Sequence, residues 1–137
     1  MYKKILVPVD LSHVRTLDKA LKTAAELARL YGAELSYLGV TSSSPGPVAH
    51  TPEEFEEKLT AFAAQRAHED GVSASAESQV VPDPARDLNH VLLAAVEKSG
   101  ADLVVMASHR PGFPEHFFAS HAGHVASHAK VSVMVVR

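Results

Sequence analysis

Residues 102–106 read Asp-Leu-Val-Val-Met, a short apolar run that leads into a turn-rich segment. A run of this kind predicts a strand that is buried on both faces of a sheet. The turn-rich segment covers residues 107–115 and contains two prolines and a glycine. After it, the apolar spacing predicts a helix to about His128 and a last strand over residues 131–136.

The residues before this strand alternate between strand-like and helix-like patterns. A weakly alternating stretch over residues 72–81 predicts an edge or half-exposed strand. Asp83 and Pro84 then predict the start of a helix that ends near Gly100.

A further helix is predicted upstream by a strong start signal. Thr51 can cap the helix, Pro52 suits the first helical position, and Glu54 completes a capping box. This helix is expected to run to about Glu69, and Gly71 ends it.

The N-terminal part repeats the alternation. Residues 5–9 form a short β-branched run, and residues 13–31 carry apolar side chains every three or four positions. Residues 5–9 predict a strand, and residues 13–31 predict a helix that ends at Gly32. Residues 35–40 predict a second strand. Residues 41–50 hold three consecutive serines, two prolines and a glycine, which predict a loop.

The chain therefore alternates strand and helix four times and closes with a fifth strand. This order needs crossover connections, so we expect an α/β fold: one domain over residues 1–137, with a parallel sheet and helices on both faces. Ligands of such open sheets bind outside the carboxyl ends of the strands, where the strand order reverses. The segments at these ends are residues 8–12, 40–44, 81–84 and 107–120.

Composition and charge limit the partners. The 137 residues have a formal net charge of −3 and no cysteine. We therefore expect no nucleic-acid partner, no disulfide framework and no thiolate metal site. No window reaches the roughly 20 apolar residues that span a bilayer, so we also expect no membrane insertion and a cytoplasmic location.

Asp10 follows the first predicted strand directly. An acidic side chain at this point can accept hydrogen bonds from a ribose or a base. It can equally serve as a turn or helix-capping residue, and its position alone does not separate the two roles.

The segment over residues 107–114 leads towards a helix that we expect to begin near His116. Backbone N–H groups at a helix N-terminus form a natural anion site, and Arg110 can add a bidentate phosphate contact. The small Ala119 and the hydroxyl of Ser120 would allow phosphates to approach closely. The alternative is a plain surface loop.

Nine histidines are more than the length predicts, and His121, His124 and His128 fall on one helical face. Their spacing can hold a divalent metal ion. No HExxH arrangement accompanies it, so we expect no metal site. The alternative is a polar helix face that titrates near neutral pH.

Both ends of the chain resemble the universal stress protein family. Residues 4–10, KILVPVD, resemble its opening, and residues 104–137 resemble its closing strand, glycine-containing loop, Gly-Ser pair, helix and Val-rich strand. Residues 107–111 look most like the short F-type bacterial branch. The resemblance implies a five-stranded, Rossmann-like sheet of the adenine nucleotide alpha hydrolase type, an ATP or AMP site, and a homodimer through the strand over residues 131–136.

The resemblance also implies particular contacts. Those to the adenosine would come from Pro8, Val9, Asp10, Val40 and Met106. Those to the phosphates would come from Ala107, Ser108, His109, Arg110, Ala119 and Ser120. Whether Mg²⁺ accompanies the phosphates is left open.

The chain departs from the family's ATP-binding pattern at three glycines. Ala107, approximately Arg110, and Ala119 stand in their places, and the span is one residue shorter. Each replacement removes backbone freedom and adds a Cβ atom near the phosphates.

Two functions from different classes follow. The first is a nucleotide-binding dimer that senses ATP or AMP in a stress response and acts on an unidentified regulatory protein partner. The second is a dimeric interaction module that has lost nucleotide binding, which the missing glycines favour. Slow ATP hydrolysis is a third interpretation. Because no GxSxG, GxxxxGK[ST] or GxGxxG motif is present, we expect no catalytic residue.

Overall fold

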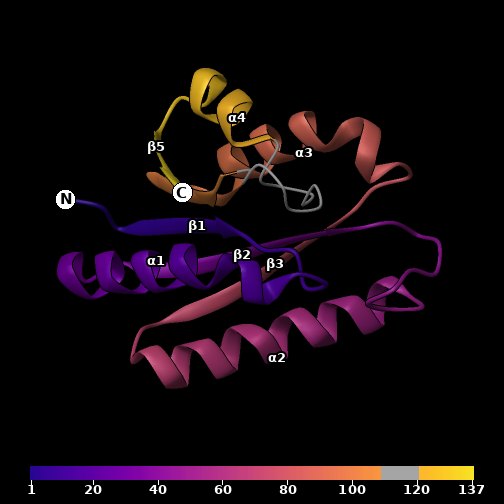
Figure 1. The fold of residues 1–137 in the computed structure, drawn as a ribbon, viewed down its shortest axis with the longest axis horizontal. Helices are drawn as coiled ribbons and strands as arrows, with labels where there is room; N and C mark the ends of the chain where they lie inside the picture. Colours follow the sequence, from indigo (N-terminus) through magenta and orange to yellow (C-terminus); the bar gives the residue numbers. More distant parts are fainter. Residues whose placement is uncertain (109–120) are drawn as a thin grey trace.

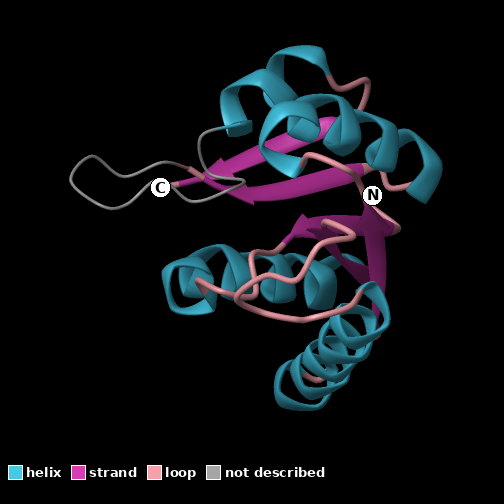
Figure 2. Cartoon of the chain, turned by 90° about the vertical axis from the view of Figure 1, so that its right-hand side faces the viewer, coloured by secondary structure: helices cyan, strands magenta, loops and turns pink. Residues whose placement is uncertain are grey.

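The computed structural model of the chain describes residues 1–108 and 121–137. Their strands form one parallel sheet in the order β3-β2-β1-β4-β5 (Figure 1). Helices lie on both sides of this sheet (Figure 2). The strands are β1 (Lys4–Pro8), β2 (Glu34–Thr41), β3 (Ala74–Val80), β4 (Leu103–Ala107) and β5 (Ser132–Val136). The helices are the 3₁₀-helix η1 (Val14–Leu17), α1 (Asp18–Tyr31), α2 (Pro52–Asp70), α3 (Pro84–Ser99) and α4 (Ala122–His128).

The predicted α/β fold with a parallel sheet and helices on both faces is confirmed. The strand predicted over residues 72–81 lies at one edge of the sheet, as expected, and β5 lies at the other edge. The helix predicted over residues 13–31 begins with a separate 3₁₀ turn before α1. The helix start expected near His116 lies outside the described residues.

Capping residues account for several helix ends. The Thr51 side chain accepts a hydrogen bond from the Glu54 N–H at 3.1 Å. The Glu54 carboxylate reaches back to the N–H of His50, at 3.1 Å, so the reciprocal bond of the capping box falls one residue earlier than in the usual motif. α1 and α2 both end at glycines with left-handed backbone, Gly32 and Gly71, each with φ of 64°.

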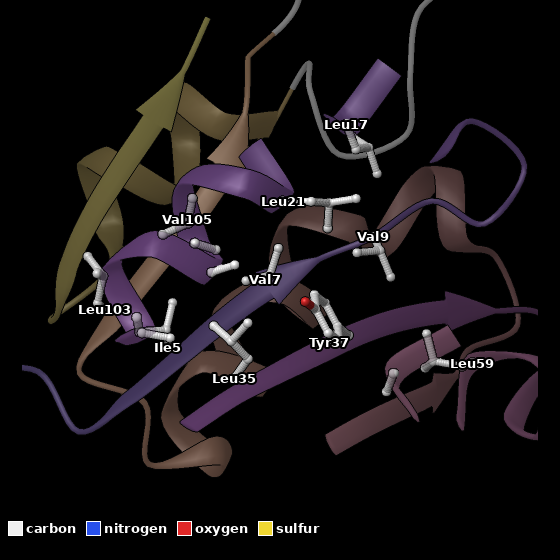
Figure 3. Packing of buried hydrophobic residues seen from close by; sticks show 14 of the residues in the cluster. Ile5, Val7, Val9, Leu17, Leu21, Leu35, Tyr37, Leu59, Leu103 and Val105 are labelled. Atoms are coloured by element: carbon white, nitrogen blue, oxygen red, sulfur yellow. The ribbon is translucent and has the colours of Figure 1, made fainter. Parts of the chain in front are cut away.

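The central strands are buried on both faces because each face has its own core cluster. One cluster packs α1 and α2 against the sheet and includes Val7 and Val105 (Figure 3). The other packs α3 and α4 against the opposite face and includes Leu6 and Val104. Neighbouring residues of one strand thus enter opposite clusters, as the two-residue period of a strand requires.

The strand order reverses between β1 and β4. β1 pairs with β2 along its whole length, from Lys4 to Pro8. With β4 it pairs only at Ile5–Leu103 and Leu6–Val104, at the amino-terminal end. Beyond these two pairs, β1 and β4 no longer pair. The reversal of strand order at which the sequence predicts a ligand site therefore concerns the carboxyl halves of these two strands.

Asp102 fastens β1 to β4 at the amino-terminal end of the sheet. Its carboxylate accepts hydrogen bonds from the backbone N–H groups of Lys3 and Lys4 at 3.0–3.1 Å. Its own N–H donates to the carbonyl of Lys4 at 3.0 Å. Burial raises the pKa of the Asp102 carboxyl, but the hydrogen bonds from Lys3 and Lys4 outweigh it and hold the pKa below its ordinary value.

We predict that Asp102→Asn destabilises the protein by about 1 kcal/mol at pH 7, after allowance for partial exposure. The amide keeps one acceptor but places an NH₂ group against the N–H groups of β1. Because the folded-state pKa is lowered, the contribution of the carboxylate is present above its unfolded pKa of about 4 and is lost as the pH falls through the folded value. Urea unfolding of wild type and Asp102→Asn at pH 7 and pH 3 measures the difference in their free energies of unfolding.

The difference between wild type and Asp102→Asn should therefore shrink in acid. Asp18→Asn, which removes an exposed ion pair with Lys22, is the matched control and should change stability little at either pH. Equal stability of Asp102→Asn and wild type at pH 7 would contradict the fastening role.

Candidate functional site

A cavity of about 170 Å³ lies at the carboxyl ends of β1 and β2. Residues 9–12 form one side of it, and the end of β2 with the loop over residues 41–49 forms another. Phe55, from the first turns of α2, and Pro84, at the start of α3, complete its lining. The cavity thus lies outside the carboxyl ends of the strands, the side on which ligands of open parallel sheets bind, and beside β1 and β2 rather than between β1 and β4, where the strand order reverses.

Gly39 allows α2 to approach β2 closely at this cavity. A Cβ atom on Gly39 would lie 2.7 Å from Cζ of Phe55 and 3.0 Å from Cδ2 of Leu59. Both distances are shorter than normal packing allows, so the glycine makes room for the Phe55 ring. The ring thereby forms an apolar wall of the cavity near Val40.

Asp10 supplies the carboxylate of the cavity. Its Oδ1 accepts hydrogen bonds from the Ser12 N–H at 3.0 Å and from the Ser12 hydroxyl at 2.6 Å. Its Oδ2 lies 2.9 Å from Nδ1 of His13. Asp10 therefore fills the turn-capping role that the sequence left open.

These contacts leave the carboxylate ionised and able to accept one more hydrogen bond. Burial raises the pKa of Asp10, but the hydrogen bonds from Ser12 and His13 outweigh it and hold the pKa below its ordinary value. A carboxylate has about four acceptor positions, and three contacts come from the described residues. The remaining position, on Oδ2, suits a ligand hydroxyl.

The Asp10, Ser12 and His13 cluster has the residue types of a catalytic triad but not its geometry. Nδ1 of His13 lies 2.9 Å from both the Ser12 hydroxyl and the Asp10 carboxylate. In a triad the imidazole uses one nitrogen for the acid and the other for the nucleophile. The cluster therefore shapes the turn after β1 and provides no proton relay to Ser12.

Of the residues expected to contact adenosine, Val9, Asp10 and Val40 line the cavity together. Pro8 is buried at the end of β1. Met106 is 1% exposed and packs in the cluster between the sheet, α3 and α4, so it lies apart from the described lining. Its role as a flank of the adenine stays a prediction.

Two residues of the expected phosphate site are described. Ala107 ends β4 and is partly buried against the α1 and α2 cluster. The Ser108 N–H donates to the carbonyl of Val136 at 2.8 Å. The other predicted contacts lie outside the described residues: His109, Arg110, Ala119 and Ser120.

Sequence reasoning missed the part of the lining that comes from the second loop and from α2. Pro47, Val48 and Phe55 were not among the expected site residues. The available signal was Gly39, a glycine in the interior of a strand, which indicates a close approach by another segment.

The three histidines expected on one helical face do not converge. Nδ1 of His121 lies 2.5 Å from Oδ1 of Asn89 on α3. The rings of His124 and His128 stack on each other, with centroids 4.1 Å apart. Across residues 1–108 and 121–137, no group of three metal-ligating side chains is placed to hold an ion. Within the same ranges, no helix combines the length and apolar character needed to cross a bilayer.

Comparison with known proteins identifies relatives along the whole chain. The family model described as the universal stress protein family matches residues 1–137. Universal stress protein G of Escherichia coli O157:H7 is 34% identical over 148 residues, and the match covers 100% of both chains.

Solved structures of similar fold include complexes with nucleotides. The universal stress protein from Archaeoglobus fulgidus in complex with dAMP has a TM-score of 0.68 and 20% identity, covering 99% of this chain and 98% of that chain. A universal stress protein family protein from Arabidopsis thaliana with AMP bound has a TM-score of 0.68 and 18% identity, covering 98% of this chain and 90% of that chain.

At these identities the solved structures establish the fold, and the full-length family and sequence matches establish the relationship. The resemblance seen at both ends of the sequence is confirmed: the chain belongs to the universal stress protein family.

Proposed function

We propose that this protein binds an adenine nucleotide in the cavity between the carboxyl ends of β1 and β2 and acts as a regulatory protein in a stress response. The observation that carries the proposal is the convergence of Val9, Asp10 and Val40 on one cavity next to the reversal of strand order. Two relatives of the same fold, solved with dAMP and with AMP, support it.

The chemistry of the cavity suits a nucleoside. Val9, Val40 and Phe55 provide apolar surface for a base, and Asp10 provides an ionised acceptor for a ribose hydroxyl. The volume of about 170 Å³ is below the range of about 300–1,000 Å³ typical of sites for drug-sized ligands. In the proposed complex the base and ribose occupy it, and the phosphates extend out of it.

The phosphates are proposed to lie towards the carboxyl end of β4, where Ser108 begins the expected phosphate loop. Three points stay predictions: the preference between ATP and AMP, the presence of Mg²⁺, and the contacts from His109, Arg110, Ala119 and Ser120. A regulatory protein partner and a cytoplasmic location also remain predictions from the sequence and the family.

The second candidate is an interaction module without nucleotide binding. The observation that favours it is the replacement of three glycines of the family pattern by Ala107, approximately Arg110, and Ala119. We expect these replacements to weaken phosphate contacts more than adenosine contacts, because the glycines of the family pattern stand at positions that the resemblance assigns to the phosphates. Binding of any of adenosine, AMP and ATP separates the two candidates, and the comparison among the three shows how much the phosphates contribute.

Isothermal titration calorimetry with adenosine, AMP and ATP tests the proposal directly. Wild-type protein should bind AMP or ATP, and Asp10→Asn should bind it roughly tenfold more weakly, because one charged hydrogen bond to the ribose becomes a neutral one. No heat from any of the three ligands at millimolar concentration would leave the interaction module as the function.

Ser12→Ala is the matched control for that titration. It removes one donor to Asp10 but keeps the carboxylate that the ribose would contact. Its nucleotide affinity should stay within a few fold of wild type. If Ser12→Ala and Asp10→Asn lose nucleotide affinity equally, the loss comes from a changed turn after β1 and not from a lost contact between Asp10 and the ligand.

We also propose a homodimer through β5. This strand lies at the edge of the sheet, and Met134 and Val135 are 39% and 37% exposed. An apolar edge strand carries unpaired backbone groups and tends to pair with another strand. A second copy of the same strand would satisfy these groups.

Val135→Lys should shift the protein from dimer to monomer, because pairing would bring two like charges into the contact between the strands. Analytical ultracentrifugation at several concentrations measures the change. Leu30→Lys is the control, since Leu30 is 73% exposed on α1 and lies outside the proposed interface. A wild-type monomer, or a Val135→Lys dimer of unchanged affinity, would contradict the dimer through β5.

A further inference from the structure

Two histidines on α4 form a pair that the nucleotide proposal does not use. His124 and His128 are four residues apart, and their rings lie 4.1 Å apart with an angle of 17° between their planes. His128 is exposed and His124 is half-buried. Both side chains can therefore exchange water contacts for a ligand without opening the core.

The hydrogen bond of His128 fixes its tautomer. Nδ1 of His128 lies 2.9 Å from the backbone carbonyl of His124. A carbonyl oxygen only accepts, so Nδ1 carries the proton and Nε2 of the neutral ring keeps its lone pair. Histidines that bind metal ions in proteins are oriented in this way, with one nitrogen donating to a carbonyl or carboxylate and the other on the ion.

The spacing of the rings suits one ion. Two imidazole nitrogens bound to the same tetrahedral ion at about 2.0–2.1 Å lie roughly 3.3 Å apart. Because each metal–nitrogen bond lies in the plane of its ring, the two nearly parallel rings, with centroids 4.1 Å apart, must turn towards a common ion to reach that separation.

We propose that His124 and His128 bind a divalent transition-metal ion of the class that prefers imidazole, namely Cu²⁺, Ni²⁺ or Zn²⁺. His121 does not take part, because its ring is held against Asn89 on α3. Within residues 1–108 and 121–137 no third ligating side chain completes the set. Affinity should follow the usual order for divalent ions, with Cu²⁺ above Ni²⁺ and Mn²⁺ weakest.

The charged neighbours of the pair leave room for the ion. Glu97 lines the same small surface pocket as His128 and places a carboxylate near the site. Lys130 also lines this pocket and pairs with Glu97 at 3.5 Å, which offsets its charge. Because both partners of this ion pair are largely exposed, it can rearrange at little energetic cost when a cation arrives.

Titration of the untagged full chain with Ni²⁺, followed by isothermal calorimetry, tests the site. His124→Gln and His128→Gln should each weaken the tightest Ni²⁺ binding by at least about tenfold, because each variant leaves one imidazole where two had acted together. His90→Gln is the control: His90 is an exposed histidine on α3 with no histidine three or four residues away. It should leave the affinity unchanged.

Electron paramagnetic resonance of bound Cu²⁺ gives a second readout. Wild type should show two coordinating imidazole nitrogens, and each single variant should show one, while circular dichroism confirms that the variants fold. Unchanged Ni²⁺ affinity in either variant, an equal loss in His90→Gln, or one nitrogen in wild type would each overturn the proposal.

Discussion

The reversal of strand order between β1 and β4 is the constraint on which the rest of the structure depends. Parallel strands need crossover connections, and right-handed crossovers to successive strands in one direction place their helices on one face. The chain therefore builds β2 and β3 with α1 and α2 on one face, and β4 and β5 with α3 and α4 on the other. Connections leave β1 and β4 towards opposite faces, so the carboxyl ends of these two strands are where a ligand is expected.

The order of elements could be predicted because local signals agreed with the global fold. Apolar runs such as residues 103–106 are long enough for a strand and too short for a helix. The N-cap Thr51 and the stops at Gly32 and Gly71 set helix ends through backbone chemistry that is readable one residue at a time. The exception was Glu54. Its carboxylate accepts a hydrogen bond from the N–H of His50 rather than from that of Thr51, and residue spacing alone does not distinguish these neighbouring donors.

The site was only partly predictable, because side-chain direction and long-range partners are absent from local patterns. Asp10 and Val40 follow from their positions at strand ends. An all-apolar strand does not reveal which face each residue enters, so the inward packing of Met106 was invisible in the sequence. The contribution of Phe55 depends on how closely α2 approaches Gly39, and the pairing of His121 depends on a residue 32 positions away.

A crystal structure of the protein grown with AMP would show whether the cavity beside Asp10 holds the nucleoside of an adenine nucleotide. We expect the adenine between Val9 and Val40, with a ribose hydroxyl within hydrogen-bond distance of Oδ2 of Asp10. AMP bound elsewhere on the protein, with this carboxylate still contacting only Ser12 and His13, would contradict it.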